Sequence, residues 1–535
     1  MKKLLSIKNL KKYFPLAKKS LFQKEQYYVR ANEDISIDIY EGETFGLVGE
    51  SGCGKSTLGR VILQLYEQTA GSTMYYGRTL VEIAPGYVVD TLKHADRYIA
   101  AYHTAAHHAN EITKKCESLG DAATFQDLQQ KNLLTAEAHT ALNKVAKIIG
   151  GFMVADTKEG SAALLELFEA NVEIAKLRSK INDIELEIEV IEGKIADRKA
   201  SGGSVDSLNQ KIAGMKKRES ELEAEIESKS GRVTAAQDAV EKLRAKHRGN
   251  AEFDDYEAML DDGIDLSRLT VREMRTIRRD LQIIFQDPYS SLNPRMTVGQ
   301  IIEEGLVTHK FFKRGSPKMK DYIVREMEDC GLSDYMFNRY PHQFSGGQRQ
   351  RICIARSLAV QPKFVVCDEC VSALDVSIQS QIINLLLELK EKEKLTYLFI
   401  SHNLSVVRYI SDRIGVMYLG NMVEVADTDT IFRDPRHPYT VALLSSIPTT
   451  DLEGLKKERI ILQGNIPSPI KPPTGCKFHT RCYMACEKCK RVPPPYVEVE
   501  PGHFVACHNL DRKVDENGNY LFEIKKSEAE LGIDK

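Results

Sequence analysis

The sequence predicts an α/β fold organised around a nucleotide-binding loop, with a large helical segment inserted into it. Three observations support this prediction. A glycine-rich loop joins an apolar strand to an amphipathic helix, two adjacent acidic residues end another apolar strand, and long heptad repeats interrupt the globular pattern. With 535 residues, the chain is expected to hold roughly three or four units of about 150 residues each.

Composition and charge narrow the classes of protein. Lysine and arginine total 74 against 76 aspartate and glutamate, a net charge of −2, so nothing indicates a nucleic-acid partner. No run of about 18 apolar residues exists, and the early lysines leave no room for a signal-peptide core. We therefore expect a soluble, cytoplasmic protein. Cysteines such as Cys53, Cys353, Cys367 and Cys370 lie in the loop or in apolar runs, which fits a reducing compartment.

The phosphate-binding loop is the strongest motif in the chain. It has the pattern G-x-x-x-x-G-K-[ST] and consists of Gly49, Glu50, Ser51, Gly52, Cys53, Gly54, Lys55, Ser56 and Thr57. Its glycines let backbone N–H groups approach phosphate oxygens, and the following helix adds its positive N-terminal end. Lys55 reaches the β- and γ-phosphates, and the Ser56 hydroxyl is a ligand for Mg²⁺. The loop therefore predicts a nucleoside triphosphate site.

Other strands end in polar residues suited to the same site. The apolar strand Phe364–Cys367 leads directly into Asp368 and Glu369, whose side chains should diverge. One carboxylate then serves Mg²⁺ while the other faces an attacking water. Two further predicted strands end at Gln286 and just before His402. These residues are candidates for positions around the triphosphate.

A second helix start is suited to an anion. Ser345 is a predicted N-cap, and Gly346 and Gly347 open a helix that runs from Gln348 to Leu358.

Near the start of the chain lies the aromatic pair Tyr13-Phe14. One of these rings either stacks on adenine or belongs to the core, and spacing alone leaves both interpretations open.

The globular pattern is interrupted between residues 78 and 262, where most of the sequence is predicted to be helical. Heptad repeats run from about 174 to 243 and are broken by a Gly-Gly turn at 202–203, which predicts an antiparallel coiled-coil hairpin. We expect ATPase core segments at 1–77 and 263–435, the helical insertion at 78–262, and a C-terminal region at 436–535.

In this order, the motifs are Gly49–Thr57, Gln286, Ser345–Gln348, Asp368-Glu369, Ser372–Asp375 and His402. The chain thereby resembles the ATP-binding subunits of ABC transporters, whose P-loop ATPase domain contains a helical subdomain. Runs at Phe285–Met296, Val371–Ser377, Ile400–Val406 and His437–Thr440 are similar to oligopeptide/dipeptide importers, specifically to the second of their two paired ATPase subunits. One departure is Cys370, where these importers usually carry proline.

The resemblance implies roles for the motif residues. Glu369 would polarise the attacking water, His402 would contact the γ-phosphate, and Gln286 would link the nucleotide state to the membrane subunits. Mg²⁺ would be held by Ser56, Gln286 and Asp368, and Tyr13 would stack on the adenine of ATP. The remaining residues would face the ATP of a partner subunit: Ser345, Gly346, Gly347, Gln348 and Asp375.

The resemblance also implies partners. These are a homologous second ATPase subunit that forms a heterodimer, two membrane permease subunits and an extracytoplasmic solute-binding protein, with no nucleic acid. The chain would lie at the cytoplasmic face of the cell membrane as a peripheral protein. Peptides are the favoured solute, and nickel and other small solutes are alternatives.

Four C-terminal cysteines match the cysteine motif of these importer subunits: Cys476, Cys482, Cys489 and Cys507. The resemblance implies a [4Fe-4S] cluster there. Four thiolates also suit Zn²⁺, and spacing does not decide between the two metals. Cys486 is an extra thiol outside the pattern.

Two non-transport ABC ATPases are alternatives because they also combine a cassette with long helices or further domains. In a chromosome-maintenance ATPase of the SMC type the coil follows the glutamine loop, whereas here it ends before Gln286. A translation factor of the ABC class carries two cassettes, whereas here one set of motifs exists. Both observations favour the transporter.

Overall fold

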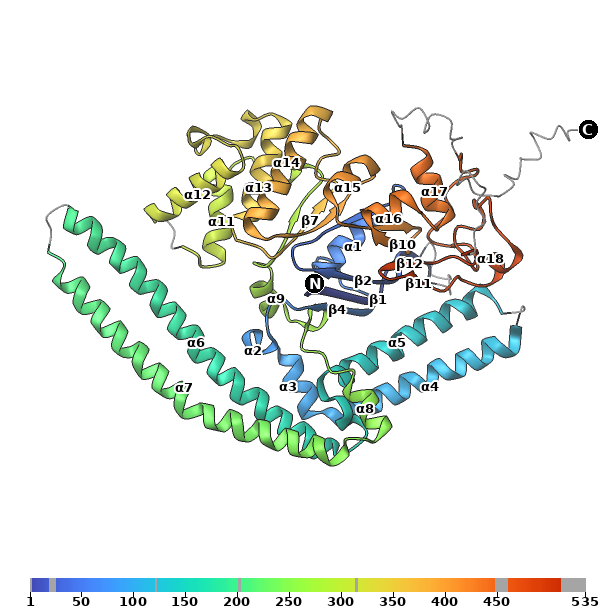
Figure 1. Cartoon of the computed structure of the whole chain (residues 1–535), viewed down its shortest axis with the longest axis horizontal. Helices are drawn as coiled ribbons and strands as arrows, with labels where there is room; N and C mark the ends of the chain where they lie inside the picture. The colour runs from blue at the N-terminus through green and yellow to red at the C-terminus, as the bar shows by residue number, and fades with distance from the viewer. Residues whose placement is uncertain are drawn as a thin grey trace, which may run out of the picture. The chain divides into compact units, whose positions relative to one another are not determined.

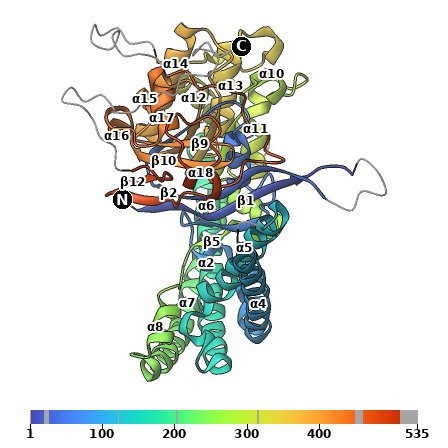
Figure 2. The same ribbon diagram turned by 90° about the vertical axis from the view of Figure 1, so that its right-hand side faces the viewer.

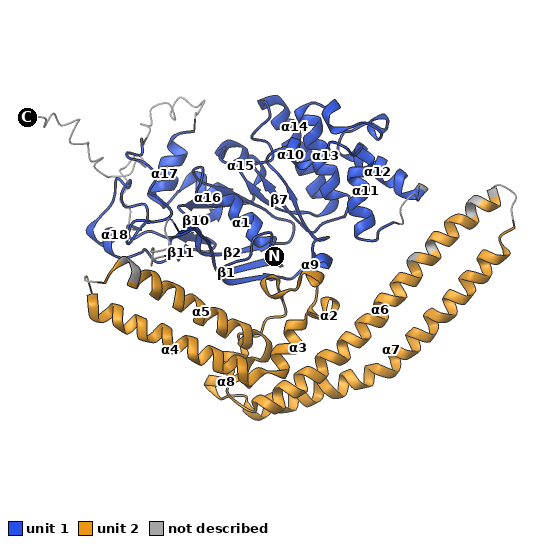
Figure 3. Cartoon of the chain, turned by 180° about the vertical axis from the view of Figure 1, so that it is seen from behind, with its two compact units in different colours: residues 1–77, 274–535 blue, residues 78–273 orange. Residues whose placement is uncertain are grey.

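The computed structural model describes residues 2–18, 26–120, 123–200, 204–312, 316–447 and 460–510. It divides the chain into two compact units, which Figure 3 colours separately. The first unit consists of residues 1–77 and 274–535, and the second of residues 78–273. The Gly-Gly turn predicted at 202–203 lies outside the described residues.

The first unit is built on an eight-stranded sheet with the order β11-β12-β10-β9-β3-β8-β7-β6. Its parallel part consists of β3 (Thr44–Val48), β8 (Thr396–Ile400), β7 (Phe364–Asp368), β6 (Leu281–Ile284) and β9 (Arg413–Tyr418). Every residue of β3, β7 and β8 is buried. Continuous apolar sequence is what a parallel strand covered on both faces requires.

Antiparallel strands extend this sheet at one edge. The strand β10 (Asn421–Asp427) forms an antiparallel hairpin with β9. The short strands β12 (His503–Val505) and β11 (Val497–Glu500) follow in the sheet. The C-terminal region therefore continues the ATPase sheet.

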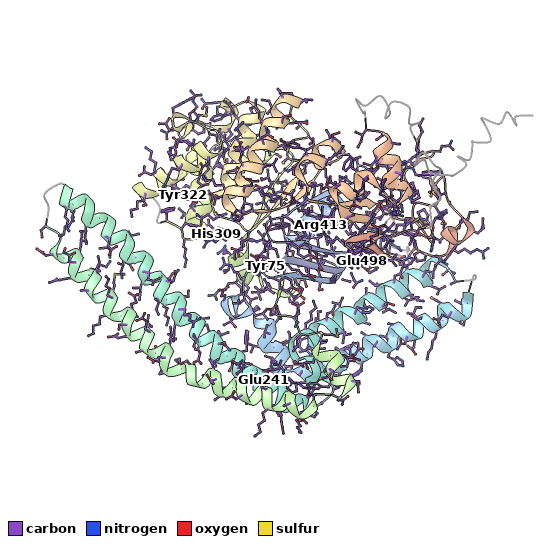
Figure 4. All side chains as sticks on the ribbon, viewed as in Figure 1. Tyr75, Glu241, His309, Tyr322, Arg413 and Glu498 are labelled. Carbon is purple, nitrogen blue, oxygen red and sulfur yellow. The ribbon has the colours of Figure 1, made fainter. Side chains whose placement is uncertain are left out.

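A smaller sheet in the same unit pairs β1 (Lys3–Pro15) with β2 (Tyr28–Tyr40) and with β4 (Ala70–Tyr75), both antiparallel. Contacts that join this sheet to the large one include those of Tyr75 and Arg413, which Figure 4 labels. Tyr75 donates to Asp280 at 2.9 Å, and Arg413 donates to the carbonyl oxygen of Asp38 at 3.1 Å.

The helices α11 (Val298–Thr308), α12 (Pro317–Asp329), α13 (Gly346–Leu358), α14 (Val376–Glu393), α15 (Leu404–Ile410), α16 (Thr428–Arg433) and α17 (Pro438–Ser445) share one apolar core with the large sheet, which includes Ile302, Ile352 and Leu386. The first unit also contains α1 (Lys55–Ile62), α10 (Pro288–Ser291) and α18 (Glu487–Arg491), with 3-10 turns at Asp334–Met336 and Pro341–Gln343. Figure 1 shows their arrangement around the strands. The helix α9 (Val271–Ile277) spans the boundary between the units.

The second unit is almost entirely helical. Its elements are α2 (Leu80–Ile83), α3 (Gly86–Lys93), α4 (Ala95–Leu119), α5 (Phe125–Ile149), the 3-10 turn η2 (Gly150–Met153), α6 (Thr157–Ala200), α7 (Asp206–His247), α8 (Ala251–Glu257), the two-residue strand β5 (Ile264–Asp265) and the 3-10 turn η3 (Leu266–Arg268). Within this unit α4 lies beside α5, and α6 beside α7 (Figures 1 and 2). In the described ranges, no helix combines the length and apolar character that crossing a bilayer requires.

The long helices α6 and α7 run in opposite directions. Ion pairs join Glu187 to Lys211 at 3.3 Å and Glu173 to Lys229 at 3.0 Å. Residue numbers therefore increase along α6 in the direction in which they decrease along α7, so the two helices are antiparallel. Their apolar stripe is buried at Ile188, Ile191 and Ile195 of α6. The two helices begin and end beyond the heptad repeats predicted for residues 174–243.

The second unit extends to Glu273, whereas the sequence predicted a boundary at 262. Contacts of the additional residues explain the difference. The backbone N–H of Asp265 donates to the hydroxyl of Tyr87 at 3.0 Å, and the carboxylate of Glu273 accepts from the N–H of Gly86 at 2.7 Å. These are pairings across more than 170 residues, which local sequence patterns do not reveal.

Candidate active site

The phosphate loop connects β3 to α1. Gly49 has φ +150° and Gly54 has φ +104°, and a Cβ atom at either position would collide with a backbone carbonyl oxygen, of Met417 or of Ala31. Only glycine fits there without strain. The Lys55 ammonium lies inside the loop, where it donates to the carbonyl oxygens of Gly49 at 2.8 Å and of Glu50 at 3.1 Å. The loop thus places a cation beside the first N–H groups of α1, which together suit an anion.

The last residue of β7 lies directly beside this loop. Asp368 is 2% exposed, and its Oδ1 accepts from the hydroxyl of Ser56 at 2.6 Å. Arg60 of α1 pairs with Oδ2 at 3.4 Å. A hydroxyl and one carboxylate are the oxygen ligands that proteins offer to Mg²⁺ when phosphates and waters complete its shell. The donor set of Ser56 and Asp368 therefore fits this ion.

Two of the predicted catalytic residues, Gln286 and His402, lie beside the carboxylate of the third, Glu369. The Gln286 amide donates to Oε2 of Glu369 at 3.0 Å, and Nδ1 of His402 lies 3.6 Å from the same oxygen. Glu369 has φ +50°, a backbone conformation that costs free energy for a residue other than glycine, and its N–H donates to Ile400 at 3.0 Å. The turn after β7 thus directs this carboxylate toward the ends of two other strands.

The signature residues form their own local structure. Ser345 caps α13 and accepts from the N–H of Gln348, whose side chain accepts in return from the N–H of Ser345. Asp375 caps α14 by accepting from Ile378 at 3.0 Å, and that hydrogen bond lowers the pKa of its carboxyl. In the part of the chain that the structure describes, the hydrogen bonds of Ser345 and Asp375 stay within these helix starts. The structure does not bring them to the phosphate loop of the same chain.

Tyr13 is 8% exposed, and its hydroxyl donates to Glu33 at 2.8 Å. Burial and the neighbouring carboxylate raise the pKa of this phenol. The guanidinium of Arg30 lies 5.8 Å from the ring centroid. Tyr13 therefore belongs to the core, and its stacking on adenine stays a prediction.

The four predicted cluster cysteines lie in one neighbourhood. The N–H of Cys476 donates to the carbonyl oxygen of Cys489 at 2.8 Å. Burial raises the pKa of Cys476 to about 11 and that of Cys482 to about 12, and the thiols of Cys489 and Cys507 contribute to both increases. Cys486, which the sequence placed outside the set, has its sulfur 3.4 Å from that of Cys489. Within residues 2–510, apart from the undescribed gaps, no three His, Cys, Asp or Glu side chains are arranged as metal ligands.

Sequence reasoning missed the residues that hold the phosphate loop from outside. Glu50 contacts Arg481 at 2.7 Å and Tyr439 at 2.9 Å, both from the C-terminal region. The available signals were the His-Pro-Tyr-Thr run and the basic residues between Cys476 and Cys482, but their partners are about 400 residues away in sequence.

Comparisons with known proteins agree with this geometry. A family model described as "ABC transporter" matches residues 32–208 and 254–372, more than half of the chain. A second, described as "Oligopeptide/dipeptide transporter, C-terminal region", matches residues 423–489.

Individual relatives agree with the family models. The chain is 53% identical over 248 residues to the putative oligopeptide transport ATP-binding protein YkfD of Bacillus subtilis. The aligned region covers 46% of this chain and 75% of that protein. It is 52% identical over 250 residues to oligopeptide transport ATP-binding protein AppF of the same organism, with coverages of 46% and 75%. OppF of Haemophilus influenzae, also an oligopeptide transport ATP-binding protein, is 46% identical over 246 residues, with coverages of 46% and 74%. The phosphate loop, the acidic strand end and these matches together show that the chain belongs to the ABC transporter family of P-loop ATPases.

Proposed function

We propose that this chain is the ATP-hydrolysing subunit of an importer of oligopeptides or dipeptides, and the second of its two paired ATPase subunits. The observation that carries the proposal is the combination of one ATPase site with the transporter C-terminal region at 423–489. The names of the relatives support the same solute class. The partners would be a homologous ATPase subunit, two permease subunits and a solute-binding protein, with the chain peripheral at the cytoplasmic face of the membrane.

Different residues of the site would bind the phosphates, hold the metal ion and activate the attacking water. Lys55 and the N–H groups of the phosphate loop bind the β- and γ-phosphates of ATP. Ser56 and Asp368, together with Gln286, would hold Mg²⁺, which would supply positive charge to the phosphate oxygens. Glu369 polarises the attacking water, and Gln286 and His402 fix the orientation of its carboxylate through Oε2.

Hydrolysis would require two chains. The start of α13 at Ser345 and the start of α14 at Asp375 make their hydrogen bonds locally. The glycine-rich start of α13 and the start of α14 would then face the ATP of the partner subunit. ATP would join the two subunits, and hydrolysis to ADP would let them separate.

We further propose that Cys476, Cys482, Cys489 and Cys507 hold a [4Fe-4S] cluster, with Zn²⁺ as the alternative. Support comes from the shared neighbourhood of the four thiols, in which the N–H of Cys476 donates to the carbonyl oxygen of Cys489 at 2.8 Å. The thiols of Cys489 and Cys507 also contribute to the raised pKa of both Cys476 and Cys482, and a bound metal would offset the cost of burying four thiolates together.

The helical insertion at 78–262 would serve as a contact for assembly or regulation, with the hairpin at about 174–243 as a coiled-coil arm. The arm's two helices bury their apolar stripe against each other, and ion pairs such as Arg232–Glu166 at 2.6 Å cross between them. Its outward surface is therefore charged and needs no further burial.

The first prediction concerns catalysis. Glu369→Gln should lower ATP turnover by about 10²–10⁴-fold while nucleotide binding persists, because the water loses its general base and Lys55 is untouched. Turnover is measured with the partner subunit present. Glu391→Gln, at an exposed helix position, is the matched control and should behave as the wild type. Lys55→Ala should instead lose binding itself, and near-normal turnover in Glu369→Gln would refute the assigned role.

The second prediction concerns the solute. The full chain, purified from detergent extract, should recover a second ATP-binding subunit and two permeases. After reconstitution into vesicles, this complex should take up a labelled oligopeptide on addition of ATP, and unlabelled peptide should compete. Competition by Ni²⁺ instead of peptide, or recovery without membrane proteins, would overturn the proposed function.

The third prediction concerns the cysteines. Protein purified without oxygen should absorb visible light and contain more iron than zinc. Cys482→Ser should lose the metal, whereas Cys486→Ser, the neighbouring thiol outside the set, should retain it. One tightly bound zinc ion would contradict the iron–sulfur cluster but confirm a metal site at these cysteines. Wild-type protein without any metal would contradict both the cluster and the metal site.

The fourth prediction concerns the insertion. Replacement of residues 79–262 by a short Gly-Ser linker should leave ATP binding intact, because the phosphate loop and its contacts lie in the other unit. Complex assembly or regulation of turnover should be impaired. If assembly, ATPase activity and uptake all equal those of the wild type, the insertion has no such role.

A further inference from the structure

The C-terminal region reaches into the phosphate loop through an arginine. Both terminal nitrogens of Arg481 donate to the carboxylate of Glu50, Nη1 to Oε2 at 2.7 Å and Nη2 to Oε1 at 3.0 Å. The Arg481 side chain is 7% exposed and that of Glu50 is 24% exposed. A bidentate pair with this degree of burial is stronger and more directional than a surface ion pair.

A second contact fixes the backbone at the same residue. The N–H of Glu50 donates to the hydroxyl of Tyr439 at 2.9 Å. Tyr439 lies in α17 and is fully buried. The side chain and the amide of one loop residue are therefore both held by residues that lie beyond the ATPase motifs in sequence.

An aromatic cluster supports these contacts. The rings of Tyr418, Tyr439 and Phe478 lie 4.8 to 5.3 Å apart, in edge-on or steeply inclined pairs. The guanidinium of Arg481 lies 5.9 Å from the centroid of Tyr418. Because Phe478 belongs to the same loop as Arg481, packing of that ring determines where the arginine can lie.

The same loop also contacts the segment that carries Tyr13. Lys477 donates to Glu33 at 2.7 Å and to the carbonyl oxygen of Leu419 at 3.0 Å. Glu33 in turn accepts from the hydroxyl of Tyr13. Lys477 and Arg481, four residues apart, thus contact Glu33 beside Tyr13 and Glu50 of the phosphate loop.

The charge at Glu50 gives these contacts a consequence. Glu50 lies within the loop that surrounds the triphosphate, and a carboxylate without a partner there would repel it through a poorly screened path. Arg481 supplies the compensating charge. We propose that Arg481 is a positioning residue for ATP, which fixes and neutralises Glu50 while Tyr439 holds its backbone. The C-terminal region then sets the affinity of the phosphate loop for ATP.

The test measures the Kd of the full-length chain for ATP with Mg²⁺, together with the Tm of the nucleotide-free protein. Arg481→Ala should raise Kd by about tenfold, because the uncompensated carboxylate of Glu50 then repels the triphosphate. Arg436→Ala is the matched control. It removes another arginine–carboxylate pair of the same region, to Glu500 at 3.0 Å, and should leave Kd unchanged.

A rescue variant separates this role from a structural one. In the Arg481→Ala background, Glu50→Gln removes the uncompensated charge, so Kd should return to within about threefold of the wild type. A loss of packing alone would not be repaired by this change. If Arg481→Ala does not fold, Arg481→Lys, which keeps the charge and loses the bidentate geometry, should show a smaller increase in Kd that Glu50→Gln again reverses.

Three results would overturn the proposal. The first is a wild-type Kd in Arg481→Ala. The second is an increase in Kd that Arg436→Ala reproduces with the same fall in Tm. The third is an increase that Glu50→Gln fails to reduce.

Discussion

The hydrogen bond between Ser56 and Asp368 is the contact on which the active site depends. It joins residues 312 positions apart, and it forms only when β3, β8 and β7 end at the same level. The register achieves this, because Ile400 of β8 is paired both with Leu47 of β3 and with Asp368 of β7. Parallel strands with matched carboxyl ends therefore bring the phosphate loop, the acidic pair and His402 to one edge of the sheet, where ligands of open α/β sheets bind.

Local patterns predicted the parts of the site that local physics determines. The glycines at 49 and 54 were predictable because backbone conformation at a phosphate loop excludes a Cβ atom, and the cap at Ser345 because a helix start needs an acceptor. The apolar strands followed from burial on both faces. Each of these signals lies within a few residues of the feature that it determines.

Contacts between distant segments could not be predicted in this way. Nothing near Glu50 indicates that its partner is Arg481, because a surface carboxylate and a paired one have the same local sequence. The left-handed backbone of Glu369 is imposed by its hydrogen bond to Ile400 and not by its own residue type. The helical unit is a further case: its extension to Glu273 rests on hydrogen bonds to α3 rather than on helical periodicity.

Each unit has an apolar core of its own. In the second, Phe152, Phe253 and Val240 are buried together with residues of α3 and α5. The exposed ion pairs along α6 and α7 are screened by solvent and contribute little, so the hairpin owes its stability mainly to its apolar stripe. An ATPase domain can carry such a segment because the segment buries its apolar side chains in its own core.

The distance in sequence between Glu50 and Arg481, 431 residues, also sets an order of events on the ribosome. At roughly 5 to 20 residues per second, the arginine emerges roughly 20 to 90 seconds after its carboxylate partner. During that interval the phosphate loop is translated but lacks the contacts that hold it. A chain whose synthesis stops between His402 and Arg481 contains every nucleotide motif, but its phosphate loop lacks the contact with Arg481. Such incomplete subunits would compete poorly for cellular ATP.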